Sequence, residues 1–130
     1  MYTNTNTLNA LAGRLGLVDT IELLELALPL IAEREQEIRQ SLLAGDWSAA
    51  ARCAHKTMSS VRLYGTHKLE LLLRQVQSAG QGQMDVPAFQ QELSAEFVAV
   101  MQSISEWLAE QATGQPPVSA FAFTRSVYSG

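Results

Sequence analysis

The chain has a single cysteine, Cys53, among its 130 residues. One thiol cannot form a disulfide within the chain, and no basic, apolar leader precedes the first predicted helix, so a cytoplasmic setting is expected. No apolar run approaches the ~20 residues that a membrane-spanning helix needs. Acidic residues exceed basic ones and the net charge is −4, which argues against nucleic acid or an anionic membrane as the partner.

Several kinds of catalytic motif are also missing. The sequence has no glycine-rich phosphate loop, no Ser-His-Asp set and no paired-carboxylate constellation, so it is not expected to be an enzyme with its own nucleotide site or cofactor. A metal site would pair His55 with His67, with Cys53 as an optional third ligand. These residues lack the i,i+4 pair or the Cys/His spacing of known sites, so no metal is expected.

What the chain does contain is helical periodicity. Hydrophobic residues make up 47% of a length that suits one domain. Apolar residues recur every three or four positions in five segments, which predicts an all-α fold: an antiparallel four-helix bundle over residues 1–114 with an additional short N-terminal helix. The expected helices cover residues 7–15, 19–45, 46–65, 66–77 and 85–113. The last carries an apolar stripe of Phe89, Leu93, Phe97, Val100, Met101, Ile104 and Leu108, with Trp107 beside it.

Local signals place the ends of these helices. Asp19 and Glu22 have the spacing of a capping box, which predicts that the second helix starts at Asp19. Pro29 interrupts that helix, so either a kink or two helices is expected. Gly45 followed by Asp46 predicts a stop and a new start, and such a short connection makes the two helices antiparallel neighbours. In the last helix, Asp85 is the expected cap.

The C-terminal segment, residues 115–130, differs from the rest. It is rich in apolar and aromatic residues and Arg125 is its only charge. A tail that folds back on the bundle or stays disordered is one interpretation. A docking segment for another protein is the other.

The segment from Asp46 to Gly65 carries the most informative pattern. Asp46 can cap its first turn, and Gly65 can end it in a left-handed conformation. At about 100° per residue, one face of this helix is apolar and should pack inward. That face comprises Trp47, Ala50, Ala54, Thr57, Val61 and Tyr64.

His55 lies on the solvent side of the same helix, about 140° from the centre of the apolar face. Its neighbours one turn away, Ala51 and Ser59, are small, and Arg52 and Arg62 lie on the same half of the helix. An exposed histidine with room around it and cations nearby is suited to nucleophilic attack on a phosphoryl group. The alternative is a surface histidine without a chemical role.

This segment resembles the signature of histidine-containing phosphotransfer (HPt) domains, the four-helix phosphocarriers of bacterial phosphorelays. Ala54 precedes His55 as in that signature, Ser60 and Gly65 match its serine and glycine, and Leu69 follows four residues after the glycine. The run from Leu42 to Trp47 is similar to the usual lead-in. Three positions differ, because the family has leucine, lysine and glycine where this chain has Thr57, Met58 and Ser59.

The resemblance implies that His55 accepts a phosphoryl group from a receiver-domain aspartate and passes it to another receiver domain. Receiver domains or a hybrid sensor kinase would be the partners, and the receiver would supply Mg²⁺. The three differences leave a second interpretation open, a degenerate helical module that binds such a partner without being phosphorylated. The expected partner surface is the exposed side of the histidine helix: Ala51, Arg52, Met58, Ser59 and Arg62.

Overall fold

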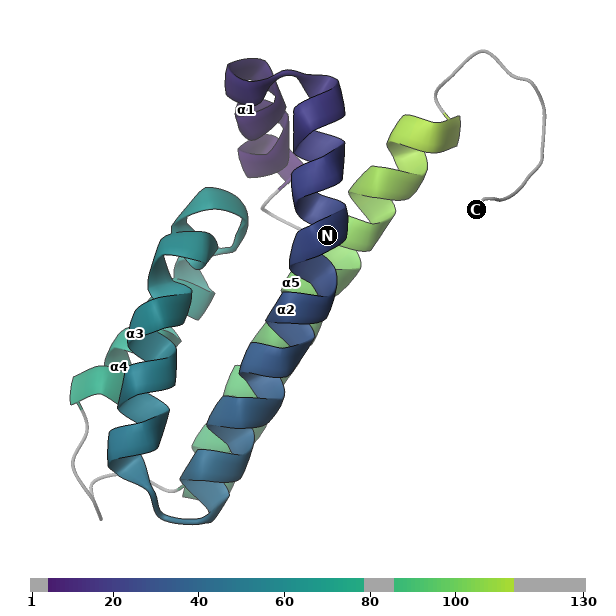
Figure 1. Cartoon of the computed structure of the whole chain (residues 1–130). Coiled ribbons are helices and arrows are strands. Elements are labelled where there is room, and N and C mark those ends of the chain that lie inside the picture. Colours follow the sequence, from purple (N-terminus) through teal and green to yellow (C-terminus); the bar gives the residue numbers. More distant parts are fainter. Residues whose placement is uncertain (1–4, 79–85, 114–130) are drawn as a thin grey trace.

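The structure, a computed structural model, describes residues 5–78 and 86–113 (Figure 1). All regular secondary structure in these two ranges is α-helical, so the predicted all-α fold class is confirmed. None of the described helices is both long enough and apolar enough to cross a membrane. The helices are α1 (Thr5–Leu15), α2 (Leu17–Leu43), α3 (Trp47–Tyr64), α4 (His67–Ser78) and α5 (Val86–Thr113).

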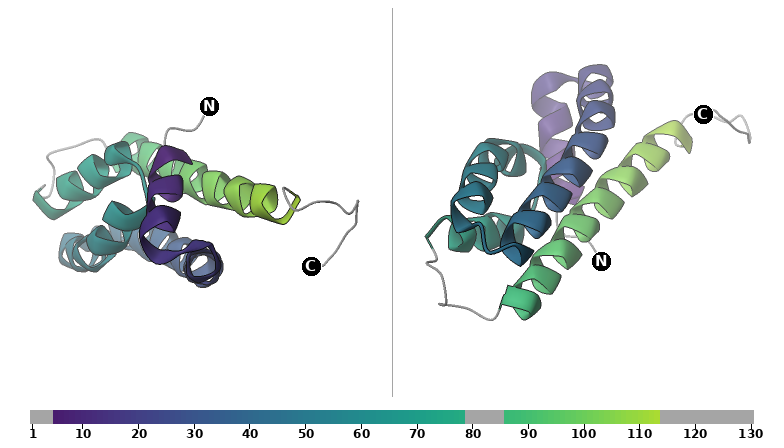
Figure 2. Two further views of the ribbon diagram at one scale, coloured as in Figure 1. Left: turned by 90° about the horizontal axis from the view of Figure 1, so that it is seen from above. Right: turned by 60° about the horizontal axis from the view of Figure 1, so that its bottom comes forward.

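Four helices form a closed ring of contacts. The two longest, α2 and α5, run antiparallel side by side, and the shorter α3 and α4 pack against each other and complete the ring (Figure 1). The predicted N-terminal helix, α1, lies across one end, where it contacts α2, α3 and α5 (Figure 2). The predictions for the C-terminal tail (residues 115–130) and for the cap at Asp85 lie outside the described residues.

The core receives side chains from all five helices. In α5 the predicted stripe is largely confirmed, because five of its seven members are buried and only Met101 and Leu108 are half-buried. Trp107 is buried as well, and its indole Nε1–H donates to Asn9 Oδ1 at 2.9 Å, which ties α5 to α1. Each large apolar side chain buried in this way contributes about 1.5–3 kcal/mol to folding.

The start of α2 differs from the capping-box prediction, which is wrong. The helix begins at Leu17, directly after Gly16, whose φ of 91° turns the chain between α1 and α2 within one residue. Asp19 therefore lies inside the first turn, and the Thr20 hydroxyl donates back to the Gly16 carbonyl at 2.7 Å.

Pro29 does not divide α2 into two helices. It lies on the exposed side, where water can satisfy the carbonyl one turn earlier that loses its N–H partner.

The turns on either side of α3 use glycine for different reasons. Before α3, Gly45 adopts a φ of 77°, and the carboxylate of Asp46 accepts from the Ala49 N–H at 3.0 Å, as predicted. After α3, the predicted left-handed Gly65 is wrong, because its φ of −98° and ψ of −163° are extended. A Cβ at Gly65 would lie 2.9 Å from both Cγ1 and the carbonyl oxygen of Val61. Glycine is needed there for close packing rather than for φ.

Candidate functional site

The inward face of α3 holds the candidate site in place. The predicted residues of this face are buried, apart from the half-buried Trp47. Thr57, where HPt domains have leucine, satisfies its hydroxyl by donating to the Cys53 carbonyl at 2.6 Å. Cys53 and Met58 are buried too, because α2 packs on one flank of α3 and α4 packs on the other.

His55 is exposed on the opposite side of α3 and contacts one residue of α4. The Nε2 atom of Gln77 lies 3.1 Å from His55 Nδ1, so this edge of the ring is held, whereas no hydrogen bond to the Nε2 edge is found among residues 5–78 and 86–113. An amide nitrogen can only donate, so in this arrangement Nδ1 accepts and a neutral ring carries its proton on Nε2. If the amide turns by 180°, its oxygen accepts from Nδ1–H and the lone pair of Nε2 becomes free.

His55 opens into a shallow depression of about 390 Å³ between α3 and α4. Three cationic side chains share this depression with the histidine: Lys56 and Arg62 from α3, and Arg74 from α4. Ser59 leaves its mouth open, since the side chain is small and exposed. The histidine therefore lies on a cationic surface that a second macromolecule can approach.

Each of these cations has an acidic partner within the protein. Lys56 Nζ lies 3.7 Å from Glu37, while Arg62 Nε and an Arg74 guanidinium nitrogen lie 3.3 and 2.6 Å from the same oxygen of Glu70. Partial burial of Glu70 acts to raise the pKa of its carboxyl, but the hydrogen bonds and charges of the two arginines outweigh this and hold that pKa below its usual range. Glu70 is therefore ionised and neutralises part of the charge around His55.

The predicted partner residues are placed as follows. Arg52, Ser59 and Arg62 are exposed, and Ala51 is half-buried. The prediction that Met58 lies on the exposed surface is wrong, since only 6% of Met58 is accessible. Met58 lies about 60° around the helix from His55, on the flank that α4 covers. Its side chain lines part of the depression instead of projecting from it.

Sequence reasoning missed the residues that α4 contributes. The sequence pattern places Arg52 beside His55, but Arg52 does not line the depression and instead donates to Ser48 Oγ at 2.8 Å, whereas Lys56 does line it. Gln77 and Arg74 are not among the predicted site residues. The short turn at Gly65 could have indicated these residues. Two antiparallel helices joined at Gly65 bring the end of α4 beside the middle of α3.

Cys53 is not a reactive thiol. Its side chain is buried, and its Sγ lies 3.4 Å from a carboxylate oxygen of Glu37. Burial, followed by the negative charge of Glu37, raises the pKa of the Cys53 thiol to about 11. The thiolate, which is the nucleophilic form, is therefore scarce at neutral pH.

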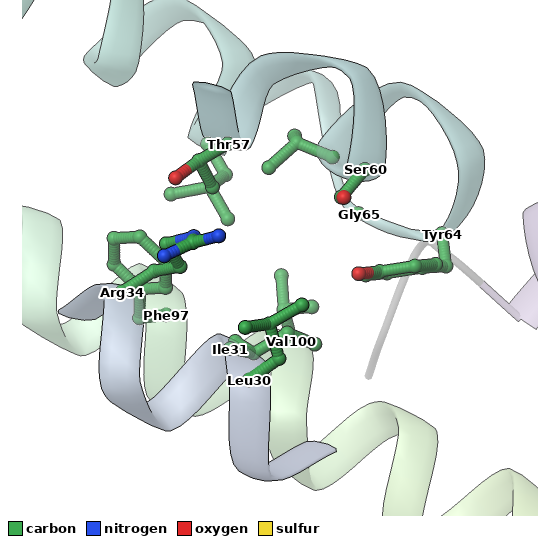
Figure 3. Close-up of a pocket in the computed structure, with 11 residues that line it drawn as sticks. Leu30, Ile31, Arg34, Thr57, Ser60, Tyr64, Gly65, Phe97 and Val100 are labelled. Carbon is green, nitrogen blue, oxygen red and sulfur yellow. The ribbon is translucent and has the colours of Figure 1, made fainter. Parts of the chain in front are cut away.

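A second pocket lies under α3, between α2 and α5 (Figure 3). The side chains of Arg34 and Tyr64 point into it from opposite sides, and Leu30, Ile31 and Val100 lie along its floor. Its volume of about 10 Å³ is the space of roughly one water molecule. Because His55 is not among its lining residues, this pocket plays no part in the candidate site.

Two further tests bear on the identity of the site. Among the described residues, no group of three or more His, Cys, Asp or Glu side chains is arranged to hold a metal ion. Comparisons with protein families, with curated proteins and with solved structures gave no match to this chain. A functional assignment therefore depends on the residues and geometry of the α3–α4 face.

Proposed function

We propose that this protein is a histidine phosphocarrier of the HPt type, acting in a multistep phosphorelay. The observation that carries the proposal is His55 itself: an exposed imidazole in mid-helix, held at Nδ1 by Gln77 and surrounded by Lys56, Arg62 and Arg74. The cations favour an arriving phosphoryl group, and the small Ser59 leaves room for the domain that delivers it.

In the proposed reaction, the lone pair of His55 Nε2 attacks the phosphorus of an aspartyl phosphate on a receiver domain. The new N–P bond forms, the O–P bond breaks, and the aspartate leaves as a carboxylate. The Gln77 amide oxygen accepts from Nδ1–H while Nε2 is the nucleophile. Once the phosphorylated ring has lost that proton to solvent, the amide nitrogen can donate to Nδ1 in the arrangement described above.

The same chemistry in reverse passes the group to an aspartate of a second receiver domain. The receiver would supply the Mg²⁺ and the acidic pocket, so the carrier needs neither a cofactor nor a nucleotide site and is not an enzyme in its own right. This function places the protein in the cytoplasm, beside a hybrid sensor kinase or free response regulators.

A second candidate is a helical docking module that binds a receiver or kinase without accepting phosphate. One observation favours it: Lys56, Arg62 and Arg74 all have acidic partners already, so the resting depression is less cationic than its composition indicates. The departures from the HPt signature at Met58 and Ser59 favour it as well. The two candidates differ in one property, the phosphorylation of His55.

The experiment is phosphoryl transfer from a panel of phosphorylated receiver domains. His55→Gln tests the nucleophile, and His67→Gln, which changes the only other histidine, is the matched control. Acid-labile, base-stable label on the wild type and on His67→Gln, but not on His55→Gln, is the expected result. Binding without any label would instead favour the docking module, and label on His55→Gln would refute the assignment of the site.

A further inference from the structure

Glu70 has an unusual position next to the candidate site. Both arginines that line the depression, Arg62 and Arg74, contact the same Glu70 oxygen, at 3.3 and 2.6 Å. Glu70 does not itself line the depression, and only 17% of its side chain is exposed. A single shielded carboxylate therefore holds two guanidinium groups that face the histidine's surroundings.

In this arrangement the single negative charge of Glu70 is shared by the positive charges of Arg62 and Arg74. A phosphoryl group carries close to two negative charges and three acceptor oxygens, so it is a stronger partner for guanidinium groups than one carboxylate. Arg62 and Arg74 are both more than half exposed, at 57% and 55% of their side chains, and can reorient at small cost. A phosphoryl group on His55 would enter the depression that these two side chains line.

We propose that Glu70 is a resident counter-ion of Arg62 and Arg74, and that phosphorylation of His55 displaces it. The inference rests on the proposed function and names a positioning residue for it. Glu70 keeps the arginines beside the depression in the resting state and then competes with the phosphoryl group for them. Because the Arg62–Glu70 pair joins α3 to α4, its exchange also changes the surface that a partner meets, so the phosphorylated and resting forms present different faces.

The first test observes the arginines directly in the full-length chain. The Nε–Hε NMR signals of Arg62 and Arg74 are recorded before and after His55 is phosphorylated with phosphoramidate, a small donor that needs no receiver domain. In that reaction the imidazole takes the phosphoryl group and ammonia leaves. Both signals are expected to shift on phosphorylation, while Arg14, which is on α1 and does not line the depression, should not respond. Unchanged Arg62 and Arg74 signals would overturn the inference.

The second test measures how long the phosphohistidine survives. Glu70→Gln removes the competing charge and should lengthen the half-life roughly 1.5- to 5-fold, the range expected for charge pairs whose arginines are more than half exposed. Glu92→Gln is the matched control, since it breaks an exposed pair with Lys68 elsewhere and changes the net charge equally. The effect should vanish in an Arg62→Gln/Arg74→Gln background, because no arginine is then left for Glu70 and the phosphoryl group to compete for. Equal half-lives of Glu70→Gln and Glu92→Gln would refute it.

A third variant separates this inference from the proposed function. His55→Glu places a carboxylate in the depression without any phosphorylation, and it should shift the Arg62 and Arg74 signals where His55→Gln does not. If it does so while no receiver domain transfers phosphate, the exchange of arginine partners stands and the phosphocarrier proposal fails. If transfer occurs and neither His55→Glu nor phosphorylation moves the arginines, the phosphocarrier stands and the role of Glu70 is refuted.

Discussion

Replacing Gly65 by alanine tests the packing of the turn that sets α4 against α3. The backbone conformation at Gly65, with φ −98° and ψ −163°, is open to any residue, so the substitution introduces no dihedral strain. The added Cβ would instead lie 2.9 Å from Cγ1 and 2.9 Å from the carbonyl oxygen of Val61. The side-chain methyl can rotate away, but the carbonyl belongs to the last turn of α3 and cannot move without distorting it.

Two opposing terms set the size of the effect. Overpacking of this kind destabilises the folded protein by about 1–3 kcal/mol. Alanine also has less conformational freedom than glycine in the unfolded chain, which stabilises the folded protein by about 0.4–1 kcal/mol. Mid-range values of the two terms leave a net loss of unfolding free energy of about 1.3 kcal/mol, and we take roughly 0.5–2 kcal/mol around that value. With an unfolding entropy of about 2.1 cal/mol/K per residue, each kcal/mol lowers the Tm of a chain this long by roughly 4 °C. We expect a decrease of about 2–8 °C.

Thermal and urea unfolding followed by circular dichroism at 222 nm would measure this change. Gly13→Ala is the matched control, because Gly13 lies within α1 with nothing within 4 Å of its would-be Cβ. That substitution should stabilise the protein by about 0.5–1 kcal/mol. Gly65→Asn separates the two explanations of the turn, since a left-handed glycine would tolerate asparagine better than alanine, whereas close packing predicts that asparagine is at least as harmful.

A Gly65→Ala protein as stable as the wild type, or more stable, would refute the packing argument. A Gly65→Asn protein clearly more stable than Gly65→Ala would point back to a left-handed turn. Either result would also weaken the positions assigned to Gln77 and Arg74, because this turn sets how α4 lies against α3.

Three further predictions concern α3. Ser59→Trp should abolish receiver binding without changing Tm, because the indole would project into solvent beside His55. Ser105→Trp on α5, also at an exposed serine, is the control. Normal receiver binding by Ser59→Trp would show that partners dock elsewhere. Arg62→Glu should slow phosphotransfer roughly fivefold, because it places negative charge at the depression beside His55. Arg14→Glu is the control and should leave the rate unchanged. If Arg62→Glu transfers phosphate as fast as the wild type, partners do not approach His55 across the α3–α4 face. Since its raised pKa of about 11 disfavours the thiolate, Cys53 should react with a disulfide reagent at pH 8 only after urea unfolds the chain, and prompt reaction of the folded protein would contradict its burial.

Much of the fold could be predicted from local patterns. The helical class, the inward face of α3, the cap at Asp46 and the stripe along α5 depend on periodicity and on hydrogen bonds within a few residues, which the sequence contains in full. The predictions that were wrong concern neighbours distant in sequence or competing local signals. The apparent capping box at Asp19 gave way to a tighter turn at Gly16, and Met58 was covered by a helix whose position no periodicity reveals.

The sequence alone determined that His55 lies on the polar side of a helix, because a residue's angle around a helix follows directly from its position in the chain. It did not determine what surrounds that histidine. Gln77 and Arg74 come from another helix, and the sharing of Glu70 by two arginines depends on how α4 lies against α3. That placement follows from the close approach of Gly65 to Val61 and from the packing of buried side chains between the helices. Only the tertiary structure could therefore turn a predicted nucleophile into a site with a defined ring contact and charge balance.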